Sequence, residues 1–128
     1  MVDPKEIDNG IAAHGAWKDR LKTAVDTGKL EIPVATISAD NQCAFGKWLY
    51  GSTLSGVDKA SPQYAEIKQL HADFHKVAGR IAQLATSGKK TEAQQMLDFG
   101  KDYTMISGKL ALALQRWKES VGQAAPVR

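Results

Sequence analysis

The chain reads HADFH at residues 71–75, in the middle of an amphipathic stretch, residues 64–85, whose apolar spacing predicts an α-helix. Two residues four positions apart on a helix lie on the same face, with their Cβ atoms about 5–6 Å apart. The imidazoles of His71 and His75 can therefore reach one metal ion. Phe74 lies between them and marks the buried side of this turn. The motif predicts part of a metal site that faces the interior of a helical protein.

Start and stop residues set the limits of two long helices. Asp3-Pro4 is typical of a helix start, with an Asp cap followed by Pro at the first helical position, and Gly28 is typical of an end. Ser61-Pro62 repeats this pattern for the helix that carries the two histidines, and Gly88 ends it. On the first helix, apolar residues recur at steps of three, four and seven, and His14 falls on their line.

A further long helix is predicted towards the C-terminus. The run Thr91-Glu92-Ala93-Gln94 is a capping box, in which the first and last side chains each bond a backbone N–H at the helix start. Apolar residues follow at steps of three and four, and Gly122 ends the helix. They form a narrow seam of the coiled-coil type: Met96, Phe99, Tyr103, Ile106, Leu110, Leu114, Trp117 and Val121.

The segment between the first two long helices has a different pattern. Residues 29–39 contain Pro33 and several β-branched residues, which predicts an extended connector. A short helix should follow, from about residue 38 or 40 to Tyr50, with Cys43 in its first turn. We therefore predict an all-α fold, an antiparallel four-helix bundle with three long helices and one short helix, as a single domain over residues 1–128.

Composition argues against nucleic-acid and membrane partners. The 17 basic and 14 acidic residues give a net charge of +3 and alternate along the chain, so no basic stripe for phosphates is present. No apolar run approaches the roughly 20 residues that a membrane-spanning helix needs, and no signal-peptide pattern opens the chain. The single cysteine forms no intramolecular disulfide and fits a reducing compartment, so we expect a cytoplasmic protein.

The three histidines and the only cysteine together predict a zinc site. Taken singly, a histidine on an apolar face is more often a core residue, and a lone cysteine is more often a small buried hydrophobe. Unpaired imidazoles in an apolar core would cost about 1–3 kcal/mol each, however, and a metal removes that cost. Three nitrogens and one sulfur form a tetrahedral set that suits zinc: His14, Cys43, His71 and His75. At a helix start, the dipole should also lower the pKa of the thiol and favour the thiolate.

Other cofactors and activities fit this set less well, although copper accepts the same ligands and the order of metal affinities favours it. A haem would use only one or two of these side chains, and a di-iron site needs Glu-x-x-His pairs, which His71 and His75 do not form. The sequence offers no Ser-His-Asp set, phosphate-binding loop or convergent carboxylate pair. Four protein ligands leave zinc no open position for a substrate, so we do not expect an enzyme.

The order of the candidate ligands resembles that of the bacterial chemoreceptor zinc-binding (CZB) domain. The similar pieces are HGAWK at residues 14–18, CAFGKW at residues 43–48 and HADFH at residues 71–75. Each piece alone is unspecific, but the three in this order are specific, and the likeness covers about residues 7–85. The predicted fourth helix also fits the helical bundle of the family.

The resemblance implies a function as well as a fold. The zinc ligands of the family are one His, one Cys and a His-x-x-x-His pair, which carry over to His14, Cys43, His71 and His75. Family members are usually dimeric regulatory modules attached to cytoplasmic chemoreceptors or diguanylate cyclases, which act in chemotaxis and cyclic-di-GMP signalling. They sense zinc, or oxidants such as hypochlorous acid that attack the zinc-bound cysteine. These 128 residues contain neither a receptor signalling hairpin nor a cyclase domain.

Two function classes stay open, a zinc- or redox-responsive sensor and a structural or interaction domain in which zinc is permanent. For the sensor we expect a two-state switch. Zinc and reduced Cys43 would hold the short helix against the first and third helices, and oxidation or zinc loss would release it.

The seam from Met96 to Val121 is too long for the short helix to cover, which predicts an exposed apolar strip and a twofold homodimer.

Overall fold

The computed structural model describes residues 2–98 and 101–123, and all regular structure in these ranges is helical. The long helices are α1 (Pro4–Thr27), α5 (Pro62–Thr86) and α7 (Asp102–Gln123). The short helices are α2 (Val34–Ser38), α3 (Ala44–Tyr50), α4 (Gly56–Lys59) and α6 (Lys90–Leu97). The prediction of an all-α fold with three long helices is confirmed. Within the described ranges, no helix is long and apolar enough to cross a membrane.

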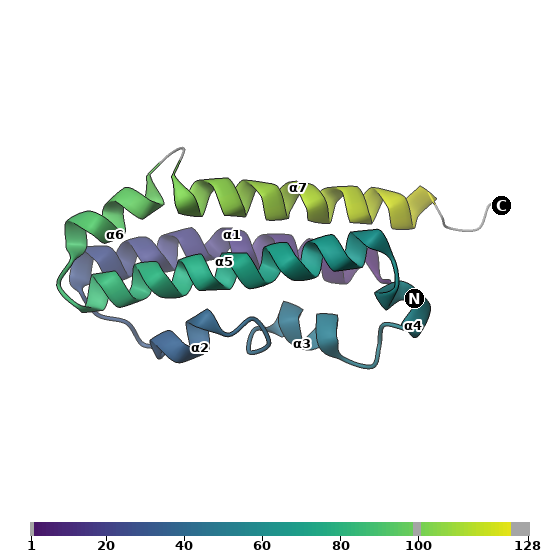
Figure 1. Ribbon diagram of the computed structural model, residues 1–128, viewed down its shortest axis with the longest axis horizontal. Coiled ribbons are helices and arrows are strands. Elements are labelled where there is room, and N and C mark those ends of the chain that lie inside the picture. Colours follow the sequence, from purple (N-terminus) through teal and green to yellow (C-terminus); the bar gives the residue numbers. More distant parts are fainter. Residues whose placement is uncertain (1, 99–100, 124–128) are drawn as a thin grey trace.

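The long helices lie side by side, and the short helices flank them (Figure 1). α1 and α5 run in the same direction, whereas α7 and the α2–α3 stretch run past them in the opposite direction. Successive rods of the chain therefore alternate in direction, as in an antiparallel bundle. α7 packs on α1 and α5 from one side, while α2 packs on α5 and α3 packs on α1 from the other side.

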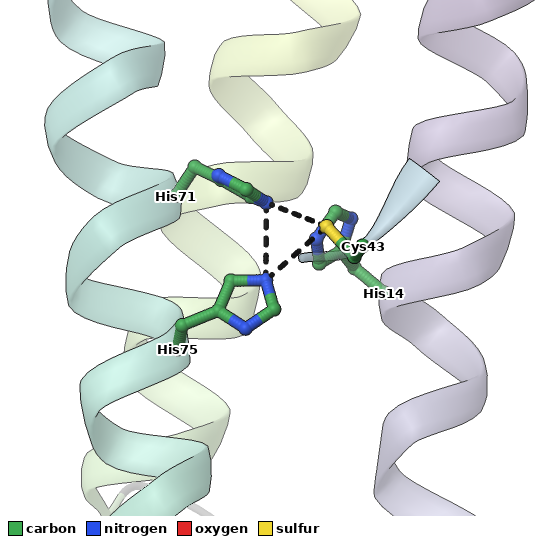
Figure 2. A group of neighbouring side chains, drawn as sticks. All are labelled: His14, Cys43, His71 and His75. Carbon is green, nitrogen blue, oxygen red and sulfur yellow. Dashed lines mark hydrogen bonds between the residues drawn. The ribbon is translucent and has the colours of Figure 1, made fainter. Parts of the chain in front are cut away.

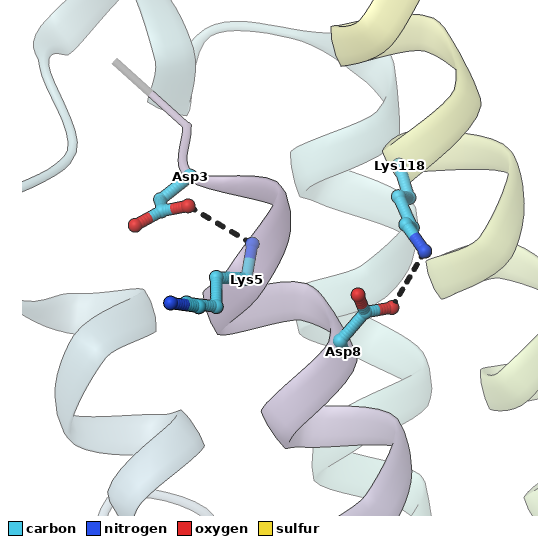
Figure 3. Close-up of polar contacts among 4 residues, drawn as sticks. All are labelled: Asp3, Lys5, Asp8 and Lys118. Atoms are coloured by element: carbon cyan, nitrogen blue, oxygen red, sulfur yellow. Dashed lines mark hydrogen bonds and ion pairs between the residues drawn. The ribbon is translucent and has the colours of Figure 1, made fainter.

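The first helix begins and ends as predicted. Asp3 is its N-cap and accepts a hydrogen bond from the N–H of Lys5 at 2.9 Å (Figure 3). Gly28 ends it with a φ of 70°, a left-handed conformation that glycine adopts without steric cost. Farther along α1, Asp8 pairs with Lys118 of α7 at 2.8 Å. Both side chains are partly exposed, so this ion pair contributes only about 0–1 kcal/mol.

α5 supplies the central row of the core. Ser61 caps this helix by accepting from the N–H of Tyr64, and Pro62 follows at the first helical position. Residues at steps of three and four form its buried face, which packs against α1, α2 and α7: Tyr64, Ile67, His71, Phe74, Ala78, Ile81 and Leu84. His75 is buried beside this row. The apolar pattern that predicted the helix therefore also turns both of its histidines inward.

The predicted fourth helix is two helices, because α6 ends at Leu97, with Asp98 as its C-cap, and a new helix, α7, begins at Asp102. The backbone of Asp98 is extended, with φ −66° and ψ 156°. Its carbonyl accepts from the N–H of Lys101 at 3.0 Å and from the hydroxyl of Thr104 at 3.1 Å, which fixes the break. Phe99 of the predicted seam lies outside the described residues.

The predicted capping box of the fourth helix is wrong. The chain enters α6 at Lys90, one residue before the expected cap, so Thr91 already lies inside the helix. The N-cap is Lys89, and its side chain makes no hydrogen bond to the free N–H groups at the helix start. A capping box needs its Thr in a non-helical conformation, and here the turn after α5 brings the chain into the helix too early for that.

The seam of α7 faces the interior of the bundle. Its central residues are at most 3% exposed and pack in the core: Tyr103, Leu110, Leu114 and Trp117. The prediction of an exposed strip along this seam is therefore wrong, because α1 and α5 of the same chain cover it. The exposed apolar residues of α7 lie on another face, where Met105 and Leu112 are each 52% exposed.

The connector after α1 is more helical than predicted. α2 forms where an extended stretch was expected, because Pro33 takes the N-cap position and Ile37 gains full burial against α5. α3 begins at Ala44, so Cys43 is its N-cap and does not lie in its first turn. The Sγ of Cys43 accepts from the N–H of Gly46 at 3.3 Å, as an N-cap side chain does.

Candidate metal centre

Four side chains converge between α1, α5 and the start of α3 (Figure 2). His14 projects from α1, His71 and His75 project from α5, and Cys43 projects from the N-cap of α3. One ligand atom of each lies within 4.8 Å of the ligand atoms of the other three. The histidines are buried and the cysteine is half-buried. Among the described residues, no carboxylate belongs to the group.

The distances among three of the ligand atoms match a tetrahedral metal site. The Nε2 atoms of His71 and His75 lie 3.1 Å apart, and the Sγ of Cys43 lies 3.4 and 3.5 Å from them. A tetrahedral zinc, with bonds of about 2.0–2.1 Å to nitrogen and about 2.3 Å to sulfur, separates its ligands by about 3.3 Å and about 3.5 Å. Imidazole and thiolate donors suit zinc, whereas Mg²⁺ and Ca²⁺ prefer oxygen.

Backbone carbonyls fix two of the three rings. The Nδ1 of His14 donates to the carbonyl of Gly10, one turn back on α1, at 2.6 Å. The Nδ1 of His75 donates to the carbonyl of Ile37 on α2 at 2.8 Å. A carbonyl only accepts, so each Nδ1 carries the proton and each Nε2 turns a free lone pair towards the centre. The Nε2 of His14 is buried and has no hydrogen-bond partner among the described residues, and a metal ion would supply one.

Two phenylalanine rings pack against the histidines. Phe45 lies edge-on to His14 and His71, with ring centroids 5.5 and 5.1 Å apart, and Phe74 lies 5.0 Å from His14. The Nδ1 of His71 is buried and has no partner in the described part of the chain, so the packing of Phe45 and the contacts of the His71 Nε2 with Cys43 and His75 hold this ring. The two rings make the surroundings of the histidines apolar, which strengthens electrostatic interactions there.

Burial keeps the histidines neutral near pH 7. It lowers the pKa of His14 to about 4 and the pKa of His71 to about 2. The pKa of His75 is also lowered by burial, although the hydrogen bond to Ile37 opposes that shift. Neutral imidazole is the form that binds metals, so no proton has to leave these rings before a metal binds.

The pKa of the Cys43 thiol differs from the prediction that the helix start lowers it. Burial raises its pKa above the ordinary value, and the charge of Asp40 adds to this shift. The N–H of Gly46 acts in the predicted direction, because it donates to Sγ and lowers the pKa, but burial outweighs it. Before a metal binds, the sulfur is therefore a thiol, and the metal has to displace its proton.

Close backbone contacts hold α3 and the loop before it. A Cβ at Gly46 would overlap the carbonyl oxygen of Asp40, so this loop packs directly on α3. The hydroxyl of Tyr50 donates to the carboxylate of Asp40, which ties the end of α3 to the same loop. A Cβ at Gly10 would overlap the ring of Phe45, so α3 packs directly on α1. These contacts set the position of the cysteine relative to the two long helices.

The structure brings together the four side chains that the sequence named as ligands. Sequence reasoning missed the carbonyls of Gly10 and Ile37, which orient two of the rings. A backbone oxygen has no sequence signature, so nothing in the chain could have pointed to them. The glycines that admit a neighbouring segment were also missed, although a glycine inside a periodic helix is itself an indication of close approach.

The comparisons with known proteins agree with this donor set. The family model described as the chemoreceptor zinc-binding domain, CZB, matches residues 14–82, more than half of the 128-residue chain. The matched range begins at His14 and contains all four converging side chains. No curated protein and no solved structure gives a significant match.

Proposed function

Because this chain belongs to the chemoreceptor zinc-binding domain family, we propose that it is a bacterial regulatory module that senses zinc or an oxidant. One zinc ion per chain is held by His14, Cys43, His71 and His75. The module passes its signal to a partner in chemotaxis or in cyclic-di-GMP signalling. This partner is a chemoreceptor or a diguanylate cyclase. It is a binding module and not an enzyme, since four protein ligands leave the metal no open position for a substrate.

One observation carries the proposal: three imidazoles and one thiol converge within 4.8 Å in the protein interior, and no carboxylate of the described residues joins them. Buried nitrogens without partners are rare in proteins, and His14 and His71 each have one that no described residue bonds. The test is a metal analysis of protein purified without added metal, in which we expect one zinc per chain. Protein that carries no zinc, and takes up none when zinc is supplied, would overturn the proposal.

Cys43 provides the response to an oxidant. When bound to zinc its sulfur is a thiolate, the form that two-electron oxidants attack. With hypochlorous acid, the sulfur forms a bond to the OH group of the oxidant, the O–Cl bond breaks, and chloride leaves with the electron pair. The product is a sulfenic acid, a weaker metal ligand than the thiolate. The three histidines are then left to hold the ion.

The α2–α3 segment, residues 34–50, is the part that moves in this proposal. It carries Cys43 and the Ile37 carbonyl, whereas the three histidines stand on the two long helices. Helices of five and seven residues have little stability of their own and depend on packing and on the metal. Zinc and reduced Cys43 therefore hold the segment on α1 and α5, and loss of either releases it.

A second candidate function is a structural or interaction domain in which zinc is permanent. The closed set of four protein ligands favours it, because structural zinc sites are closed in this way. Zinc affinity separates the two candidates. A sensor exchanges zinc near the free concentration in the cell or loses it on oxidation, whereas a structural ion stays bound through both treatments.

In this proposal the module acts as a twofold homodimer, the commonest symmetry of soluble oligomers. The exposed face of α7 supports it, since Met105 and Leu112 are each 52% exposed and lie two helical turns apart. Gly108 lies between them, and a Cβ there would meet nothing within 4 Å. The same face of a second chain would cover this apolar surface.

A further inference from the structure

α2 makes a very close approach to α5 at Gly79. A Cβ at this position would overlap the Oγ of Ser38 and lie 2.9 Å from its Cβ and 3.1 Å from its Cα. The hydroxyl could rotate away, but the Cβ and Cα of Ser38 move only with α2 itself. Any residue larger than glycine at position 79 therefore has to push the end of α2 away from α5.

This contact lies next to the hydrogen bond that orients His75. Gly79 follows His75 by about one turn on α5, and Ser38 directly follows Ile37 on α2. The approach at Gly79 thus sets the distance of 2.8 Å between the Ile37 carbonyl and the Nδ1 of His75. A shift of α2 by several tenths of an ångström would weaken that bond. The bond keeps the proton on Nδ1 and turns Nε2 towards Cys43.

We propose that Gly79 is a positioning residue of the metal site: it lets α2 approach α5, so that the carbonyl of Ile37 holds the ring of His75. This assignment rests on the proposed zinc-binding function and gives α2, which carries no ligand, a share in the zinc affinity. The position of Gly79 agrees with it. A glycine in the interior of a 25-residue helix lowers helix stability, and here the missing side chain makes room for α2.

Gly15 provides a matched control for a substitution at Gly79. It also lies inside a long helix and beside a candidate ligand, His14, but a Cβ there would meet nothing within 4 Å. Gly15→Ala therefore makes the same chemical change, but the added methyl group meets no neighbouring atom. Both substitutions favour the helical conformation, so we expect the metal-free variants to stay helical by circular dichroism.

The first test measures zinc affinity by competition between the metal-free protein and a chelator. We expect Gly79→Ala to bind zinc about tenfold more weakly than the wild type, the loss typical of a missing partner to a metal-binding histidine. We expect Gly15→Ala to bind like the wild type. In the double variant Ser38→Gly/Gly79→Ala the overlap with the Ser38 side chain is gone, so most of the lost affinity should return.

The second test reads the His75 ring directly by nitrogen NMR of the metal-free protein. We expect the proton on Nδ1 in the wild type and in the double variant, and a mixture of the two ring tautomers in Gly79→Ala. A merely structural substitution would not change the tautomer of one ring. If Gly79→Ala did not fold, the wild-type spectrum would still test the proposal. A His75 without a proton on Nδ1 in the wild type would overturn it.

The results separate this proposal from the proposed function. Unchanged affinity in Gly79→Ala, an equal loss in Gly15→Ala, or no recovery in the double variant would each overturn the role of Gly79. None of these outcomes affects zinc binding by the wild type. A wild-type chain that takes up no zinc would overturn the proposed function itself, and the first titration would reveal it before any variant is made.

Discussion

The Nδ1 of His75 on α5 donates to the carbonyl of Ile37 on α2, six residues before Cys43 in the chain. Residues 37–43 thus supply one candidate ligand and also the acceptor that orients another. Metal binding and docking of this stretch therefore share contacts. By thermodynamic linkage, zinc stabilises the docked stretch by the same free energy with which the docked stretch increases zinc affinity.

Replacing one ligand should remove tight zinc binding without unfolding the bundle. Cys43→Ala and His75→Ala each leave three ligands, so we expect zinc affinity to fall by orders of magnitude. The helices should stay folded, because the apolar core along α5 and α7 does not depend on the metal. The measurements are the zinc retained after a chelator challenge and the helical circular dichroism.

The matched control for these ligand variants is Lys76→Ala, an exposed change one residue from His75. It should retain zinc like the wild type. Full zinc retention in both Cys43→Ala and His75→Ala would mean that the ligands have been assigned wrongly.

Zinc binding should release one proton per chain at a pH between about 6.5 and 8. Burial lowers the pKa of each histidine below its ordinary value of 6.5, so the rings have no proton to lose. Burial raises the pKa of Cys43 above its ordinary value of 9.0, so the thiol has one. Affinity should therefore rise about tenfold for each unit of increasing pH.

Titration calorimetry in buffers with different ionisation enthalpies measures this proton count. The histidine variants provide an internal comparison, since removing a neutral ring should leave the count unchanged, whereas Cys43→Ala should bring it to zero. Release of two or more protons near pH 6.5 would show that the rings are protonated before zinc binds, contrary to their burial.

Helix limits followed from the sequence where the determining contacts are local. Asp3 and Ser61 bond N–H groups two or three residues away, so their caps can be read from neighbouring residues. The break at Asp98 could not be read in this way, because the apolar seam continues across it. The burial of Ile37 against α5 is likewise a long-range gain, and it outweighs the extended preference of the residues around it.

The candidate site was predictable because its side-chain types are rare in this chain. Three histidines and one cysteine leave few combinations, and helical spacing already places His71 and His75 together. The pKa of Cys43 was not predictable, since burial is a tertiary property and here it opposes the effect of the helix start. The partners of the rings are backbone atoms, whose positions follow only from how α2 packs on α5.

A charge on the exposed face of α7 should dissociate the proposed homodimer. Leu112→Glu and Met105→Glu each place a carboxylate where the second chain would bury an apolar side chain, which costs free energy unless the charge is paired. We expect both variants to be monomers in light scattering at micromolar concentration. Lys76→Glu, on the exposed face of α5, is the control and should stay dimeric.

A monomeric wild type in that experiment would refute the dimer itself. A dimer that persists in both Leu112→Glu and Met105→Glu would place the interface on another face of the molecule.

Zinc loss or oxidation of Cys43 should loosen residues 41–54 while the long helices stay protected. α3 has seven residues and is held by Cys43 at its start and by packing on α1, so it has little stability without the metal. Hydrogen exchange across residues 41–54 is measured for zinc-bound protein, zinc-free protein and protein treated mildly with hypochlorous acid. We expect slow exchange in the first state and faster exchange in the other two.

Cys43→Ala separates oxidation of this thiol from other damage by hypochlorous acid. Its exchange should already be fast across residues 41–54 and should not change after the oxidant is added. In every state the core of α5 serves as the internal reference, because its buried row packs on α1, α2 and α7. Equal protection in the three states of the wild type would mean that the segment does not respond to the metal. Zinc would then be a permanent structural ion, and the sensor proposal would give way to the structural one.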